Sequence, residues 1–272
     1  MAGRAETPRA NAFYTSATRD NRVFVVPNHL CLLFVLLVAG AASADEPIRL
    51  YIPEAPPLAM NQYAGGHGMV GDVTLAALAR IGKLTRIVAE PWPRAQANVT
   101  KGKDMLIIPL SRTPEREQLY TWIAPIMELE RAFFSLDEPV ADFARARARY
   151  RRIGVGMGTA QVGILQREGF SDEQIVQLKL GENPTHLLVL GRIDAWFTGV
   201  PEALYIWGNS PYRERNLRRS PSLASTGLYL GCSRECDEQL VEQLRRAIEE
   251  LELEGISQRL QQAYLPKPQP GD

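Results

Sequence analysis

The chain has 272 residues, of which 45% are hydrophobic and 23% charged, so it is long enough for one large or two modest globular domains. Its formal net charge of zero argues against a nucleic-acid binder that relies on a strongly basic surface. The concentrated basic run at 145–152 (RARARYRR) has no accompanying aromatic stacking platform, and we predict a solvated turn or strand edge there.

The first 44 residues have the pattern of a secretory signal peptide. An apolar run at 30–38 (LCLLFVLLV) leads to small residues ending at Ala44, and four arginines precede it: Arg4, Arg9, Arg19 and Arg22. We predict cleavage after Ala44 and a periplasmic location. The apolar run is too short to span a bilayer. Removing the peptide, which contains four Arg and two acidic residues, would leave a charge of about −2.

Export to an oxidising compartment changes how the cysteines are interpreted. Cys31 belongs to the signal peptide, which leaves Cys232 and Cys236 in the segment CSREC. A local disulfide between these two is one hypothesis. Metal ligation is the other, but there is no second Cys pair and only His67 and His186 remain, so we expect no metal site. No cofactor is expected.

In chain order, short apolar runs alternate with amphipathic stretches, a pattern typical of α/β layering. Strands are predicted at 48–52, 84–90 and 104–110. Helices are predicted at 71–82 and 94–102, and a further helix is expected to open at 113–119. This is a βαβαβ series with short connections.

A strand predicted at 128–136 would carry the chain out of this first series, after which the alternation of strands and helices restarts. Strands are predicted at 151–156, 193–198 and 227–233. Helices are predicted at 160–169, 184–191 and in the C-terminal segment, with a further helical stretch beginning at Ser171, where Gln174 is placed for a capping box. The C-terminal helix has five apolar residues at helical spacing: Leu240, Leu244, Ala247, Ile248 and Leu251.

Two such series predict two α/β lobes joined by connecting strands near 128–136 and 222–230. Lobe 1 would comprise 45–130 and the return at 225–265, lobe 2 would comprise 131–224, and the tail at 266–272 would be flexible. A ligand site between the lobes would lie at the carboxyl ends of the strands, where helix N-termini gather.

Four segments carry a resemblance to a known family: GKDMLIIPLSRTPERE (102–117), RIGVGMGTAQVGILQREGF (152–170), LGRIDAWFTGVPEAL (190–204) and LVEQLRRAIEELELEGISQRLQQAYL (240–265). In order and content they resemble the family 3 extracellular solute-binding proteins, the periplasmic amino-acid receptors of ABC importers. The resemblance implies a type 2 periplasmic binding fold with two Rossmann-like lobes. It also implies a small carboxylate ligand, membrane permease subunits as partners and a monomeric protein, with no nucleic acid.

The segment SRTPER at the end of the third strand is a candidate carboxylate site. Thr113 followed by Pro114 is a strong helix start, with the hydroxyl at the N-cap. In the family that the chain resembles, Ser-x-Thr-x-x-Arg holds the ligand α-carboxylate, which implies this role for Ser111, Thr113 and Arg116. A guanidinium can grip a carboxylate through two parallel hydrogen bonds.

The segment GMGTAQ (156–161) is the equivalent in the second lobe. Glycines after a strand allow close approach of the backbone to a ligand. The resemblance makes Gly158, Thr159 and Ala160 a second set of donors to the same carboxylate. A dinucleotide loop is disfavoured because the GxGxxG spacing fails at Thr159.

Other positions depart from the amino-acid pattern. The family places an aspartate, which holds the α-ammonium, five residues after the Asp of GRxDA, and this chain has Gly199 there. Glu202, three residues on, and Glu54 in the first Pro-rich turn are candidate substitutes. Asp194 itself is expected to be structural, at the start of a strand. Trp92 is a candidate wall for the ligand, and Arg94 a candidate second cation beside it.

The function expected from these residues is a receptor that captures a polar amino acid or a related organic acid, the second being favoured by Arg116, Arg94 and Gly199. No nucleophile elbow or metal-spaced His set is present, so an enzyme is not the first expectation. Two alternatives stay open. One is a cyclohexadienyl-dehydratase-like enzyme that uses a cleft carboxylate as general acid. The other is a ligand-sensing partner of a membrane receptor.

Overall fold

The computed structural model describes residues 46–61 and 65–265, so the predicted signal peptide and the predicted flexible tail lie outside the described residues. The chain divides into two units, Met1–Ala44 and Asp45–Asp272, and the second contains all of the described residues. Among the described residues, no helix is both long enough and apolar enough to cross a membrane.

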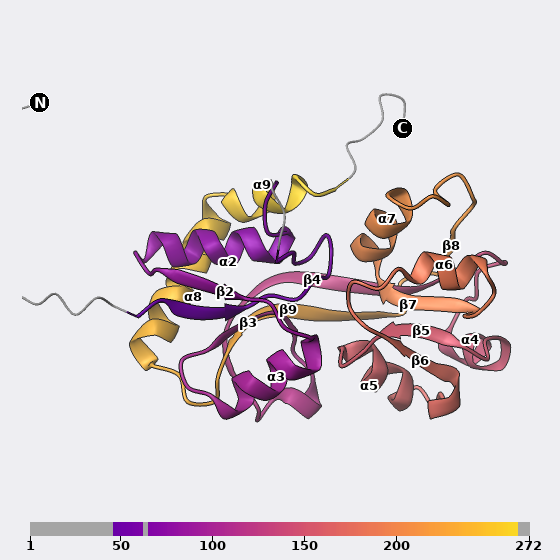
Figure 1. Ribbon diagram of the computed structural model, residues 1–272, viewed down its shortest axis with the longest axis horizontal. Helices are drawn as coiled ribbons and strands as arrows, with labels where there is room; N and C mark the ends of the chain where they lie inside the picture. The colour runs from indigo at the N-terminus through magenta and orange to yellow at the C-terminus, as the bar shows by residue number, and fades with distance from the viewer. Residues whose placement is uncertain (1–45, 62–64, 266–272) are drawn as a thin grey trace, which may run out of the picture. The chain divides into compact units, whose positions relative to one another are not determined.

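One mixed sheet runs through this unit in the order β2-β1-β3-β9-β4-β7-β5-β6 (Figure 1). At one end β1 (Ile48–Tyr51) pairs in parallel with both β2 (Thr85–Val88) and β3 (Leu106–Ser111). At the other end β5 (Ile153–Gly156) pairs in parallel with β6 (Ile175–Leu178) and β7 (Ala195–Gly199). Each end of the mixed sheet is therefore a parallel group of strands: β1, β2 and β3 form the first parallel sheet, and β5, β6 and β7 form the second.

Two long antiparallel strands join these ends. They are β4 (Thr121–Ser135) and β9 (Ala224–Cys232), which pair with one another. β9 also pairs with β3, and β4 also pairs with β7, both antiparallel. A short strand, β8 (Arg218–Arg219), pairs with the end of β4. The predicted connecting strands are thus present, and β4 begins well before residue 128.

Helices cover both faces of the first parallel sheet. On one face lie α2 (Met69–Arg80), α8 (Glu238–Leu253) and α9 (Ile256–Gln262), and on the other lies α3 (Trp92–Lys101). The alternation along β3 explains the two faces, because Leu106 packs in one core and Ile107 in the other. The apolar stripe of α8 buries the five residues that its spacing predicted.

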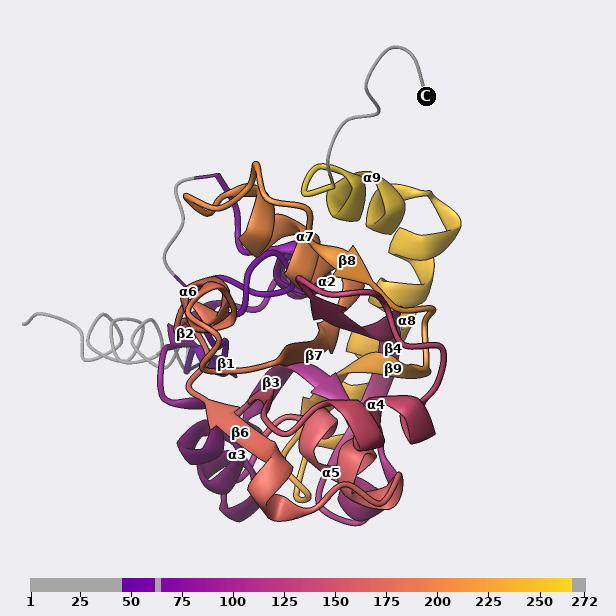
Figure 2. The ribbon, with the colours of Figure 1, turned by 90° about the vertical axis from the view of Figure 1, so that its right-hand side faces the viewer.

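The second parallel sheet is covered in the same way. α4 (Phe143–Arg149) and α5 (Ala160–Arg167) lie on one face, and α6 (Pro184–Val189) and α7 (Val200–Gly208) on the other (Figure 2). Phe133 packs with the first pair and its neighbour Phe134 with the second. The layered α/β fold class predicted from the alternation is confirmed.

Three local predictions were wrong. The stretch after Ser171 is a 3-10 turn (η2, Asp172–Gln174) followed by strand β6; the capping box is present, but the β-branched residues after it join the sheet. The helix expected from Thr113 is a single 3-10 turn (η1, Pro114–Arg116), and Thr113 makes no side-chain cap bond. The basic run belongs largely to α4, which Asp142 caps by accepting a hydrogen bond from the Arg145 N–H at 2.7 Å.

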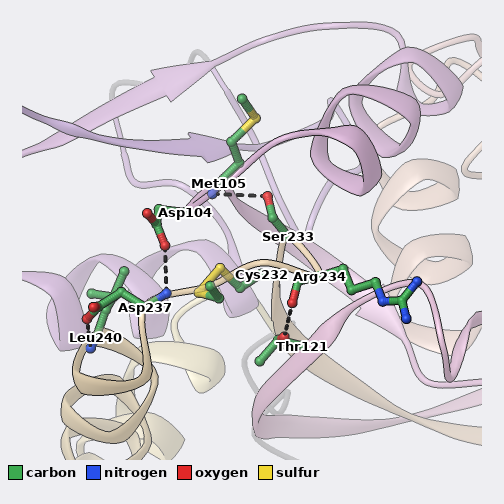
Figure 3. The surroundings of a disulfide bond; sticks show 9 residues. Asp104, Met105, Thr121, Cys232, Ser233, Arg234, Asp237 and Leu240 are labelled. Carbon is green, nitrogen blue, oxygen red and sulfur yellow. Dashed lines mark hydrogen bonds between the residues drawn. A yellow bond between two sulfur atoms is a disulfide. The ribbon is translucent and has the colours of Figure 1, made fainter.

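The two remaining cysteines form a disulfide where β9 leads into α8 (Figure 3). Their Cα atoms are 6.1 Å apart. Around the bond, the Asp237 N–H donates to the Asp104 carboxylate at 2.6 Å, and the Met105 N–H donates to Ser233 Oγ at 3.2 Å. The disulfide hypothesis is confirmed, and the bond closes the junction through which β9 leads into α8.

Reduction of this disulfide is expected to lower the free energy of unfolding by about 2 kcal/mol, because the closed loop is short and loop entropy grows only slowly with length. Urea denaturation with and without dithiothreitol measures the difference. Thiol titration of the denatured full-length chain should find only Cys31 without reductant. Three free thiols would contradict the bond.

Candidate ligand-binding cavity

A cavity of about 40 Å³ lies where the ends of β3 and β5 approach the two long strands. Its lining combines residues from both parallel sheets, from β4 and from the first turns of α5 and α7. Six of the lining side chains are polar or charged: Ser111, Arg116, Arg131, Thr159, Gln161 and Glu202. Four of these were predicted from the sequence, and Arg131 and Gln161 are additional.

Arg116 at the end of η1 lines the cavity and bridges its two sides. Its Nη1 donates to the Ser111 carbonyl at 3.3 Å, and its Nη2 donates to the Gly158 carbonyl at 2.8 Å. Burial lowers the pKa of the Arg116 guanidinium, and no carboxylate among the described residues forms an ion pair with it. Glu115 interacts with it only through space, and a half-buried cation without an ion-pair partner favours an anion beside it.

The other two members of the predicted clamp differ from each other. Ser111 is buried and lines the cavity, and its Oγ accepts a hydrogen bond from Arg131 Nη2 at 2.9 Å. Because this oxygen accepts from a guanidinium, its own proton is left for another acceptor. Thr113 is buried in extended backbone conformation and does not line the cavity.

The predicted second set of donors lies at or next to the cavity, and Gly158 itself does not line it. Gly158 has φ 70°, and its carbonyl accepts from Arg116 and, at 2.9 Å, from Gln96 Nε2. Thr159 and Ala160 line the cavity at the start of α5. The Thr159 hydroxyl donates to the Gly156 carbonyl at 2.6 Å, so the first-turn N–H groups of α5 are the free donors on this side.

Arg131 is a buried cation that was not predicted from the sequence. It lies in the middle of β4, opposite Gly199 in the register with β7, and only 1% of it is exposed. Nη1 donates to Thr226 Oγ1 at 2.7 Å and to the Leu129 carbonyl at 3.2 Å, whereas Nε has no partner among the described residues. Burial lowers its pKa to about 10, and nearby Glu202 opposes that shift.

The alternation of the two faces along β4 could have identified Arg131 from the sequence. In a strand, residues two apart share a face, and Arg131 stands between Leu129 and Phe133, which are both buried. An arginine in that register faces inward. The pattern could have identified it as a buried charge, although its partners Ser111 and Thr226 are distant in sequence.

Glu202 occupies the space in front of Gly199. A Cβ added at Gly199 would lie 2.6 Å from Glu202 Oε2, so the carboxylate stands where a side chain at 199 would begin. The same oxygen accepts from the Thr198 hydroxyl and from the Gly199 N–H, both at 3.1 Å. Burial raises the pKa of the Glu202 carboxyl, and Arg131 counteracts this.

Of the remaining residues singled out from the sequence, one lines the small cavity and the others lie elsewhere. Trp92 is buried among the apolar residues between α3 and β3, and it also lines the cavity. Arg94 is exposed and does not line the cavity, so it is not placed to act as the second cation there. Glu54 lines a neighbouring, larger cavity. Asp194 accepts hydrogen bonds from the N–H groups of Arg151 and Arg152, a structural role.

No cluster of three or more His, Cys, Asp and Glu side chains suited to a metal ion occurs among the described residues. The polar groups of the small cavity are two guanidiniums, one carboxylate, an amide and two hydroxyls. Such a set can hold a carboxylate and an ammonium group through charge-assisted hydrogen bonds.

No family model matches the chain, and no curated protein matches it in sequence. Solved structures do match. ArtJ, the arginine-, lysine-, histidine-binding protein of Geobacillus stearothermophilus, aligns with a TM-score of 0.71 and 17% identity, covering 83% of this chain and 97% of that one. A variant of ArgBP from T. maritima aligns with a TM-score of 0.68 and 17% identity over 80% and 94% of the two chains.

A histidine kinase sensor domain with similarity to periplasmic binding proteins aligns equally well, with a TM-score of 0.71 and 17% identity over 83% and 98% of the two chains. At this level of identity the likeness defines the fold. The chain has the two-lobed periplasmic binding protein fold, with two α/β lobes joined by β4 and β9. Two of these three similar structures are binding proteins and the third is a sensor domain.

Proposed function

We propose that this protein is a periplasmic solute-binding protein that captures an L-amino acid between its two lobes and delivers it to the permease subunits of an ABC importer. The observation that carries the proposal is the placement of Glu202. Its buried carboxylate lies against Gly199, in the same cavity as Arg116 and Arg131. A carboxylate therefore stands beside the position where the resembling family has its ammonium-binding aspartate.

The ligand carboxylate would lie at Arg116 and the Ser111 hydroxyl on one side and at the first N–H groups of α5 on the other. This arrangement uses charge-assisted bonds in a site largely shielded from water. The α-ammonium group would lie at Glu202. Of the predicted site residues, Thr113 and Arg94 do not line the cavity and have no part in the proposal.

Capture would close lobe 1 (45–130 and 225–265) on lobe 2 (131–224). The bonds from Arg116 and Gln96 to the Gly158 carbonyl, and the ion pair between Glu115 and Arg167, support this because each joins the two lobes. Ligand binding that favours the closed arrangement would shift the equilibrium between open and closed forms. ArtJ and the other amino-acid-binding structures of the same fold support the choice of ligand.

A thermal-shift screen of L-amino acids, dicarboxylates and polyamines tests the proposal. At least one L-amino acid is expected to raise the melting temperature progressively with concentration, as binding to the folded state alone requires. Polyamines lack the carboxylate and should leave it unchanged. If no carboxylate-bearing compound raises the melting temperature, the receptor proposal is wrong.

A dehydratase on the same scaffold is a second candidate, favoured by one observation. Burial raises the pKa of Glu202, and a general acid must hold a proton near neutral pH. Turnover of prephenate that Glu202→Gln abolishes would establish this function. Turnover that the variant retains, or none at all, would reject it.

A signalling role in place of transport predicts binding to a sensor kinase domain instead of a permease.

A further inference from the structure

A second cavity, of about 280 Å³, adjoins the small one. Four residues line both cavities, and they mark the junction: Ala55, Gln161, Leu180 and Glu202. The larger cavity extends from there between α7, the segment that follows β6 and the first Pro-rich turn. A ligand that occupies the small cavity with its carboxylate therefore has room to extend in this direction.

The junction contains polar atoms that have no hydrogen-bond partner among the described residues. Gln161 is 5% exposed, and its side-chain amide forms no hydrogen bond with any described residue. Glu202 is 8% exposed, and both of its hydrogen bonds go to Oε2, which leaves Oε1 without a partner among the described residues. Buried polar groups are rarely left unsatisfied, so these two are suited to a ligand's amino group.

Beyond the junction the walls are mainly apolar, formed by Val155, Leu178, Trp196 and Ile206. Such walls can bury methylene groups, whose removal from water is favourable. A ligand with a short side chain would leave this space vacant. The walls therefore favour a side chain of several carbons.

Besides Glu202, two further carboxylates line the larger cavity. Glu54 comes from lobe 1 and Glu182 from lobe 2, and the lining contains a single cationic residue, the exposed Lys179. A Cβ added at Gly181, next to Glu182, would lie 3.6 Å from Glu54 Cβ, so the two segments are in contact across the lobes. Neither carboxylate forms an ion pair among the described residues.

The geometry points to an L-amino acid with a long side chain that ends in a cation, and this inference rests on the proposed function. The α-carboxylate lies at Arg116, the α-ammonium at Glu202 and Gln161, and the methylene groups along the apolar walls. The terminal cation lies between Glu54 and Glu182. Closing the lobes brings these like charges together, and a cation between them offsets their repulsion. A ligand with an acidic side chain would increase this repulsion.

Two pairs of near-isosteric ligands test the inference by isothermal titration calorimetry. L-arginine is compared with L-citrulline, and L-lysine with L-norleucine, because within each pair the terminal charge is the main difference. The charged member of each pair is expected to bind about tenfold more tightly. Equal or weaker binding of the charged members, or tighter binding of L-glutamate than of either, would overturn the inference.

The double variant Glu54→Gln, Glu182→Gln locates the effect. It should bring the two members of each pair within about twofold, because it removes the charges that hold the terminal cation. The matched control is Glu249→Gln, an exposed position on α8 that lines neither cavity and should keep the full discrimination. Retained discrimination in the double variant would also overturn the inference.

The outcomes separate this inference from the proposed function. If L-alanine or L-glutamate binds best and Arg116 is needed, the receptor proposal stands and the inference fails. If no amino acid binds, both fail.

Discussion

Replacing Arg116 with Ala is expected to weaken amino-acid binding about 100-fold, or ~3 kcal/mol, which is the largest effect of any substitution in the cavity. The guanidinium bridges the two lobes, donating to Ser111 on one side and Gly158 on the other, and has no carboxylate partner of its own among the described residues. The variant loses both the counter-charge for the ligand and a contact that closes the lobes. Isothermal titration with the tightest-binding L-amino acid measures the loss.

Arg112→Ala is the matched control for this variant. Arg112 lies four residues away and carries the same charge, but it is exposed, pairs with Glu117 and stacks on Trp122 and Tyr229. Its loss should leave the dissociation constant within about twofold, because an exposed charge is screened from the cavity. An unchanged dissociation constant in Arg116→Ala would exclude Arg116 as the anchor of the carboxylate.

Replacing Glu202 with Gln should remove the preference for an α-amino group. Gln keeps an oxygen that can accept from Thr198 and Gly199, but it lacks the charge that holds an ammonium group. We expect the tightest-binding L-amino acid to bind about 30-fold more weakly, ~2 kcal/mol, while its α-hydroxy analogue is little affected. A variant that still prefers the amino acid by the wild-type factor would show that the ammonium lies elsewhere.

The same variant has a pH signature without ligand. Burial raises the pKa of Glu202 above its ordinary value of 4.5, so the folded state holds the proton more tightly than the unfolded state does. Ionisation of Glu202 therefore destabilises the folded protein as pH rises above 4.5, until the raised pKa is passed. Relative to wild type, Glu202→Gln should gain stability over that window. Urea denaturation from pH 4 upward measures it, and a pH-independent difference would argue against the shift.

The layered fold could be predicted from the sequence because its signals are local. Alternating apolar runs gave the strands, helical spacing gave the buried face of α8, and the order of four motifs gave the family resemblance. The exceptions were short segments: the capping box at Ser171 starts only one turn before Ile175 enters β6. In so short a segment, pairing with β5 outweighs local propensity.

That Ser111 and Arg116 line one cavity could also be predicted, since they are close in sequence and lie at the end of one strand; the carboxylate that they would bind stays a prediction. The sequence could not choose between Glu54 and Glu202 as the partner of an ammonium group, and it could not decide whether Arg94 faces the site. Those assignments depend on β4, β7 and β9 pairing across long stretches of chain; Arg131, for example, bonds to Thr226 at a separation of 95 residues.

By itself, then, the sequence predicted a two-lobed α/β fold, which the structure has, and it proposed a cation for a carboxylate ligand. The tertiary structure decided which charges share the cavity. It buried Arg131 and Glu202 there, left Arg94 in solvent and placed Glu202 in front of Gly199. The physical reason is that burial of a charge is a property of all the segments packed around it, and these segments meet only when the chain is folded.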